Sequence, residues 1–115
     1  MPKYLIKASY TDEGVGGLLK DGGSTRRDAA EQALKTVGGK MEAFYFAFGN
    51  TDAFVIVDAP DHATVLAASL AINASGAVRT KTVVLLTPEE INQAAHKSVA
   101  YQAPGQEEPQ FRPIS

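Results

Sequence analysis

The sequence predicts a single α+β domain whose elements follow the order strand, helix, strand, strand, helix, strand. Three observations support this prediction. Four runs of alternating residues have the period of β-strands, apolar stripes of helical spacing lie after the first and third runs, and a Gly-Asn-Thr-Asp turn joins the second run to the third. A chain of 115 residues has room for one hydrophobic core of this kind.

The first half of the chain is expected to form a strand, a broken helix and an aromatic strand. Residues 3–10 alternate with period two, which is typical of a strand with two different faces. Thr11 can cap a short helix that ends at Gly22-Gly23, and Ser24 is expected to cap a second helical segment that ends at Gly38-Gly39. Residues 40–48 alternate again, with apolar side chains on both faces.

The second half repeats the pattern. Residues 53–59 are expected to return antiparallel to the second strand as a hairpin partner. Asp61 caps the next helix, which runs to Gly76, and residues 78–87 form the fourth strand. Thr87-Pro88-Glu89-Glu90 then has the residues of a capping box, which predicts a short terminal helix.

The folded domain is predicted to span residues 1–98, followed by a flexible or arm-like tail over residues 99–115. From Tyr101 onward the sequence is rich in Pro, Gln and Glu and has no periodic apolar face. Such a segment is expected either to stay mobile or to lie as an arm over a neighbouring molecule.

The order of elements is that of the ferredoxin-like fold, in which two helices cover one face of a four-stranded antiparallel sheet. Counted by period two, the phenylalanines of the central hairpin share the other face, and they form a larger apolar patch than a monomer normally exposes. Pairing of two such sheets in a homodimer, or in a higher even oligomer, is therefore expected. The predicted interface residues are Lys7, Phe44, Phe46, Phe54, Arg79 and Lys81.

Charged residues share the face predicted for this interface. The three basic residues of the interface lie on the first and fourth strands, whereas Glu42 and Asp58 lie on the second and third. These charges either pair across the two-fold axis or merely line the rim of the sheet.

Composition excludes several classes of function. With 11 basic and 13 acidic side chains, the net charge of −2 disfavours a nucleic-acid partner. The absence of cysteine removes disulfides and thiolate chemistry and is typical of a reducing compartment, so a cytoplasmic location is expected. The sequence has no signal peptide and no apolar span for a membrane, and its two histidines, His62 and His96, lack the spacing of a metal site. We therefore expect no membrane partner, no metal and no cofactor.

Four residues are candidates for binding a small apolar or anionic metabolite: Tyr10, Arg26, Tyr45 and Asp52. The two tyrosines either face a ligand or are core residues with satisfied hydroxyls. Arg26 can bind an anion through its guanidinium group, although a solvated surface position is the alternative. Asp52 follows the hairpin turn, where an aspartate commonly stabilises the bend; the alternative is a pocket acid or base. No catalytic residue is identified, because the sequence shows no nucleophile, base and orienting group together.

The chain resembles the GYD family of small uncharacterised proteins over about residues 3–88. The strings that carry the resemblance are Tyr4-Leu5-Ile6-Lys7, Tyr10-Thr11, Glu13-Gly14-Val15, Arg26-Arg27, Gly38-Gly39-Lys40, Phe44-Tyr45-Phe46-Ala47-Phe48-Gly49, Asp52, Pro60-Asp61 and Ser75-Gly76-Ala77-Val78-Arg79-Thr80. The resemblance implies a dimeric α/β barrel, in which two ferredoxin-like sheets pack face to face. The family's Gly-Tyr-Asp appears here as Gly49-Asn50-Thr51-Asp52, so Thr51 stands where the tyrosine is expected.

Three functional hypotheses follow. The first is a homo-oligomeric small-molecule-binding or structural module. The second is an enzyme that resembles the cofactor-free monooxygenases and isomerases built on dimeric α/β barrels, with Tyr10, Tyr45 and Asp52 around its substrate. The third is a ligand-sensing domain similar to the effector domains of feast/famine regulators. A ligand held without turnover favours the third, whereas an enclosed pocket with a strongly shifted acid or base favours the second.

Overall fold

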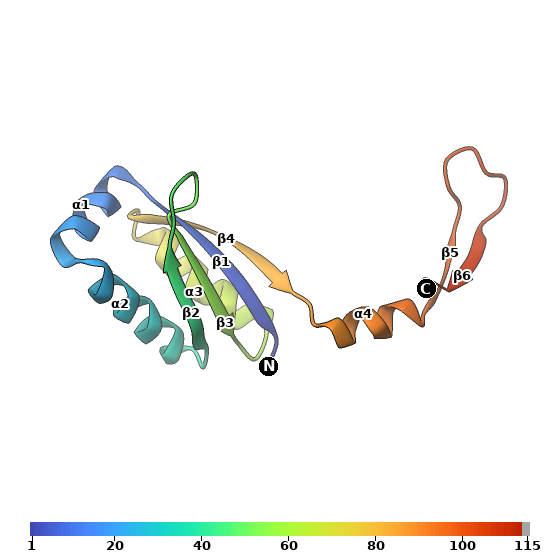
Figure 1. Cartoon of the computed structure of the whole chain (residues 1–115), viewed down its shortest axis with the longest axis horizontal. Coiled ribbons are helices and arrows are strands. Elements are labelled where there is room, and N and C mark those ends of the chain that lie inside the picture. Colours follow the sequence, from blue (N-terminus) through green and yellow to red (C-terminus); the bar gives the residue numbers. More distant parts are fainter. Residues whose placement is uncertain (114–115) are drawn as a thin grey trace. The chain divides into compact units, whose positions relative to one another are not determined.

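A computed structural model describes residues 1–113 and divides the chain into two compact units, Met1–Leu85 and a second unit that begins at Leu86 (Figure 1). The elements of the first unit are β1 (Lys3–Tyr10), α1 (Asp12–Asp21), α2 (Gly23–Thr36), β2 (Lys40–Phe46), β3 (Ala53–Asp58), α3 (His62–Ala74) and β4 (Val78–Leu85). Those of the second are α4 (Pro88–Ala95), β5 (Ser98–Tyr101) and β6 (Gln110–Pro113). None of the helices in the described part of the chain combines the length and apolar character needed to cross a membrane.

The first unit contains a four-stranded antiparallel sheet in the order β2-β3-β1-β4. Helices α2 and α3 lie on the same face of this sheet, because side chains from both helices and from all four strands line one common cavity. This arrangement confirms the predicted ferredoxin-like α+β fold.

The core lies between this face and the helices. Its central β1 and β3 positions alternate in burial, as the period of a strand requires, and Val57 is fully buried at 0% exposure. Burial of each large side chain stabilises the fold by about 1.5–3 kcal/mol. The core cluster consists of Tyr4, Ile6, Leu34, Val55, Val57, Ala59, Val65 and Ala68.

The crossover from β1 to β2 is a broken helix, as the glycine pair predicts. Gly22 separates α1 from α2 at φ 87°, a backbone conformation that glycine adopts without strain. Thr11 caps α1, and its hydroxyl accepts a hydrogen bond from the Gly14 amide. The prediction that Ser24 caps the second segment is wrong, because α2 already begins at Gly23 and has no side-chain cap.

A β-bulge in β2 corrects the predicted face of two phenylalanines. The register shifts between Met41 and Ala43, which leaves Glu42 as an extra residue. Phe44 therefore lies opposite Val55 and Phe46 opposite Ala53, both on the helix-covered side of the sheet. The prediction that these two residues share the exposed face with Phe54 is wrong, because period-two counting fails across the bulge.

The uncovered side of the sheet, which we call the open face, retains the other predicted interface positions. Leu5, Tyr45, Phe54, Ile56 and Val83 supply its apolar surface, whereas Lys7, Arg79 and Lys81 supply its positive charge. The Tyr45 side chain is 71% exposed and the Val83 side chain 41% exposed.

Glu42 and Asp58 have a partner within the chain. The Lys3 ammonium group donates to both carboxylates, with Nζ–O distances of 2.7 Å in each case. The two carboxylates therefore need no basic residue from a second molecule, and the local ion-pair cluster agrees with the alternative that these charges line the rim of the sheet.

The second unit begins with the predicted capping box. The Thr87 hydroxyl accepts from the Glu90 amide at 3.1 Å, and the Thr87 amide donates to the Glu90 carboxylate at 3.1 Å. Strands β5 and β6 then form an antiparallel hairpin, which the sequence did not predict. The domain boundary after residue 98 and the arm-like role of the tail stay predictions, and residues 114–115 of that tail lie outside the described residues.

Candidate functional site

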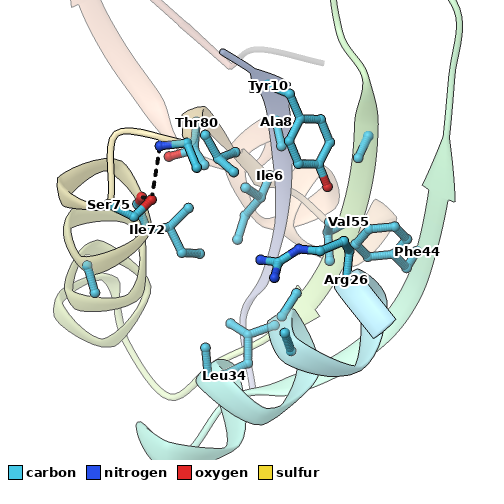
Figure 2. A pocket seen from close by; sticks show the side chains of 17 residues that line it. Ile6, Ala8, Tyr10, Arg26, Leu34, Phe44, Val55, Ile72, Ser75 and Thr80 are labelled. Carbon is cyan, nitrogen blue, oxygen red and sulfur yellow. Dashed lines mark hydrogen bonds between the residues drawn. The ribbon is translucent and has the colours of Figure 1, made fainter. Parts of the chain in front are cut away.

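A cavity of about 310 Å³ lies between α2, α3 and the helix-covered side of the sheet (Figure 2). Its lining residues are mostly apolar. Helix α2 contributes the small side chains of Ala29, Ala30 and Ala33, and the sheet contributes those of Ile6, Phe44 and Val55. The short alanine side chains leave a gap that larger residues would fill. Ala30 and Ala33 recur at helical spacing in the sequence, and their small size is the signal that could have indicated the cavity.

Two polar side chains on the wall remain able to bind a ligand. Figure 2 shows the Arg26 guanidinium group extending into the cavity near the ring of Tyr10. Ser75 and Thr80 also line the cavity, but their hydroxyls donate to the Ile72 carbonyl at 2.7 Å and to the Asn73 side chain at 3.1 Å. Arg26 and Tyr10 therefore form the polar end of an otherwise apolar chamber.

Arg26 is held only loosely by its neighbours. It lies in the first turn of α2, and its Nη1 atom is 3.5 Å from the Asp21 carboxylate, with both side chains more than a third exposed. An ion pair of this length at a partly exposed site contributes little free energy. The guanidinium group can therefore turn from Asp21 to an anion in the cavity.

Asp52 stabilises the backbone next to the site. Its carboxylate accepts a hydrogen bond from the Tyr10 amide at 2.8 Å, and its own amide donates to the Ala8 carbonyl at 2.8 Å. These bonds fix the end of β1, from which the Tyr10 side chain enters the cavity. The Asp52 carboxylate thus binds the backbone of β1, whereas the sequence predicted either stabilisation of the hairpin bend or a pocket acid or base, and its side chain is not part of the wall.

Tyr45 does not belong to this site. It lies opposite Phe54 on the open face, because the bulge in β2 reverses the side to which the residues after Glu42 point. The structure therefore brings together Tyr10 and Arg26 of the four predicted ligand-binding residues, places Asp52 beneath Tyr10, and separates Tyr45 from all three.

Burial raises the pKa of the Tyr10 phenol above its ordinary value of 10.0. The Arg26 guanidinium group opposes this shift through its charge and a hydrogen bond, whereas the Asp52 carboxylate adds to it. The phenol is thus protonated at neutral pH and can donate a hydrogen bond to a ligand in the cavity.

We expect the Tyr10 phenol to ionise above pH 10 in the folded protein and at about pH 10 in urea. A raised folded-state pKa stabilises the fold fully below the unfolded pKa, and this contribution is lost as the pH rises through the folded pKa. Ultraviolet titration of the wild type and of Tyr10→Phe measures tyrosine ionisation, and the difference between the two curves reports the ionisation of Tyr10. A difference curve with its midpoint at or below pH 10 in the folded protein would contradict the shift.

A second hollow, the α3–β4 groove, has a volume of about 350 Å³ and lies between α3 and the outermost strand. The Tyr4 hydroxyl lies 2.6 Å from Nδ1 of His62 beneath it, and the two rings meet edge to face. Leu66, Leu70 and Val84 form its exposed apolar rim, with exposures of 57%, 59% and 48%. This groove was not anticipated from the sequence.

Comparison with known proteins gives two findings. The family model described as the GYD domain matches residues 4–95. A protein of Thermus thermophilus named "Glutamine synthetase and cystathionine beta-lyase binding protein" is 29% identical over 82 residues, which cover 71% of this chain and 85% of that protein.

Proposed function

This chain belongs to the GYD domain family, and we propose that it is a binding module whose cavity holds a small carboxylic acid with an apolar body. The proposal rests on one observation: one guanidinium group and one phenol line an otherwise apolar cavity. Convergence of a few polar groups on an apolar pocket is the usual composition of a small-molecule site.

The two polar groups suit a carboxylate. A guanidinium group donates two parallel hydrogen bonds to the two oxygens of a carboxylate, and the Tyr10 hydroxyl can add a third. Alanine, isoleucine and phenylalanine side chains would surround the rest of the ligand. The cavity volume of about 310 Å³ equals that of about ten water molecules in the liquid, which fits a ligand of about ten to fifteen non-hydrogen atoms.

The wall of this cavity does not favour the enzyme hypotheses. Among the described residues that line it there is no aspartate, glutamate or histidine to act as an acid or base. Asp52, which the monooxygenase-like alternative used, makes its hydrogen bonds to the backbone of β1 and its turn. Binding without turnover therefore agrees best with the groups present.

The open face supports a second proposed function, association with proteins, and first of all with another copy of this chain. Its apolar residues are partly exposed, and its basic residues Lys7, Arg79 and Lys81 make no ion pair within the described part of the chain. A surface that combines exposed apolar and charged residues in this way is typical of an interface. The name of the Thermus thermophilus relative, which refers to the binding of two enzymes, is compatible with such a role.

Titration calorimetry against short carboxylic acids, such as hexanoate, octanoate, benzoate and phenylacetate, tests the cavity. We expect at least one of them to bind, and Ala33→Leu to weaken its binding by about tenfold or more, because the added side chain occupies the chamber. Arg26→Gln should weaken it by about 10- to 100-fold, since a charge-assisted hydrogen bond contributes about 1.5–3 kcal/mol.

The matched control is Ala67→Leu, which adds the same side chain at an exposed position of α3 away from the cavity and should bind as the wild type does. The methyl ester of the bound acid should bind the wild type and Arg26→Gln about equally. If Ala33→Leu and the wild type bind the acid with equal affinity, the ligand lies elsewhere. If none of the acids binds to the wild type, the proposed ligand class is refuted.

A further inference from the structure

The two edges of the sheet differ in how well they are protected. Strand β2 forms one edge, and the bulge at Glu42 interrupts its ladder. Strand β4 forms the other edge and pairs with β1 over eight successive residues without a bulge. Within the first unit nothing pairs with the outer side of β4. A long regular edge of this kind presents free backbone groups to which another strand can bind.

The surroundings of this edge are apolar as well as unpaired. The α3–β4 groove runs beside it, with the exposed side chains of Leu66, Leu70 and Val84 along its rim. A strand added to β4 would cover this groove in the same step, so main-chain hydrogen bonds and apolar burial would act together.

The second unit supplies short elements that lack a core of their own. Helix α4 has eight residues and each strand of the β5–β6 hairpin has four, and none of the described side chains of these elements is buried. Isolated elements of such lengths are marginally stable in water. Val99 and Tyr101 lie on one side of β5, at 49% and 61% exposure. This hairpin therefore needs another surface to become stable.

The charges of the second unit and of β4 also favour binding between them. The segment from Leu86 onward carries four glutamates against two basic side chains, and Glu107 and Glu108 lie between the hairpin strands. The exposed basic residues Arg79 and Lys81 lie on β4. Opposite charges on two surfaces speed their association and fix their register.

We propose that the β5–β6 hairpin of one copy of this chain adds to the free edge of β4 in a second copy, where Val99 and Tyr101 cover the α3–β4 groove. A second copy is the occupant because only Leu86 and Thr87 connect β4 to α4, and Thr87 is held as the helix cap. A short connection of this kind favours exchange between molecules over folding back onto the same sheet. This contact is separate from the cavity and adjoins the open face only along β4.

Hydrogen–deuterium exchange of the full-length protein tests the contact. In Val99→Lys/Tyr101→Lys the apolar side chains are replaced by cations, which are costly to bury against the apolar rim of the groove. The peptide that covers β4 should therefore exchange about tenfold faster than in the wild type. Ala100→Gln is the control, because its side chain points away from the groove and adds no charge on the side where Arg79 and Lys81 lie. The peptide that covers β2, the other edge, should exchange equally in all three proteins.

A mixing experiment identifies the copy that supplies the hairpin. The Val99→Lys/Tyr101→Lys chain is labelled with ¹⁵N and mixed with an excess of unlabelled wild type, and its labelled β4 peptide should become protected again. If the wild type protects its own β4 but never the labelled one, the hairpin docks within its own molecule and the exchange is refuted. If β4 of the wild type exchanges as fast as that of the double variant, the hairpin does not bind this edge at all.

Discussion

Substitution of Gly14 by alanine is expected to destabilise the domain by about 3 kcal/mol, because the added methyl group has no room. A Cβ atom at position 14 would lie 1.9 Å from the Ala77 carbonyl oxygen and 2.9 Å from its carbon. The contact is with backbone, and the same carbonyl accepts a hydrogen bond from the Thr11 amide at 3.0 Å. Neither side can move without breaking the junction of β1, α1 and the loop after α3.

Thermal unfolding followed by circular dichroism measures this effect. A loss of about 3 kcal/mol should lower the Tm by about 10–20 °C in a domain of this size. Gly16→Ala is the matched control on the same helix, since a Cβ atom there meets nothing within 4 Å. We expect Gly16→Ala to stabilise the protein by about 0.5–1 kcal/mol through helix propensity. A Tm of Gly14→Ala equal to that of the wild type would contradict the close approach.

Substitution of Phe54 by glutamate is expected to weaken self-association of this chain by about 30-fold or more. Phe54 lies at the centre of the open face, between Lys7 on β1 and Tyr45 on β2. Loss of a central aromatic residue commonly costs an interface about 2 kcal/mol or more, and the new charge must also be desolvated. Sedimentation velocity over a dilution series of the wild type and the variant measures the change.

Phe46→Glu provides the contrast, because Phe46 lies on the opposite side of the sheet at 44% exposure. Its ring packs against Phe44 with centroids 5.0 Å apart, so the substitution should lower the Tm and leave the dimer dissociation constant unchanged. A folded Phe54→Glu variant with the wild-type dissociation constant would refute pairing through the open face. A monomeric wild type at high concentration would refute self-association itself.

The Phe54→Glu and Phe46→Glu variants distinguish the strand register of the structure, which contains the bulge, from the uninterrupted alternation that the sequence predicts. Uninterrupted alternation along residues 40–48 places Phe46 and Phe54 on one face, whereas the register with its bulge places them on opposite faces. A larger effect of Phe46→Glu than of Phe54→Glu on association would therefore favour uninterrupted alternation. The reverse order would support the bulge.

The candidate site could be predicted only in part. Arg26 was a candidate because its guanidinium group can bind an anion, and Tyr10 because its hydroxyl can face a ligand; both line the cavity. Tyr45 was assigned to the same site on residue type alone, and the side to which it points depends on the bulge. The cavity itself depends on the distance between α2 and the sheet, and no local sequence pattern predicts that distance.

The sequence by itself determined the order of the elements up to α4, the caps at Thr11 and Thr87 and the break at Gly22, because these depend on residues a few positions apart. The tertiary structure decided the face of each residue after Glu42, the cavity beside Arg26 and the hairpin near the end of the chain. These features depend on how strands pair and how layers pack. Such contacts join residues that are far apart in the sequence, so the local alternation of residues does not encode them.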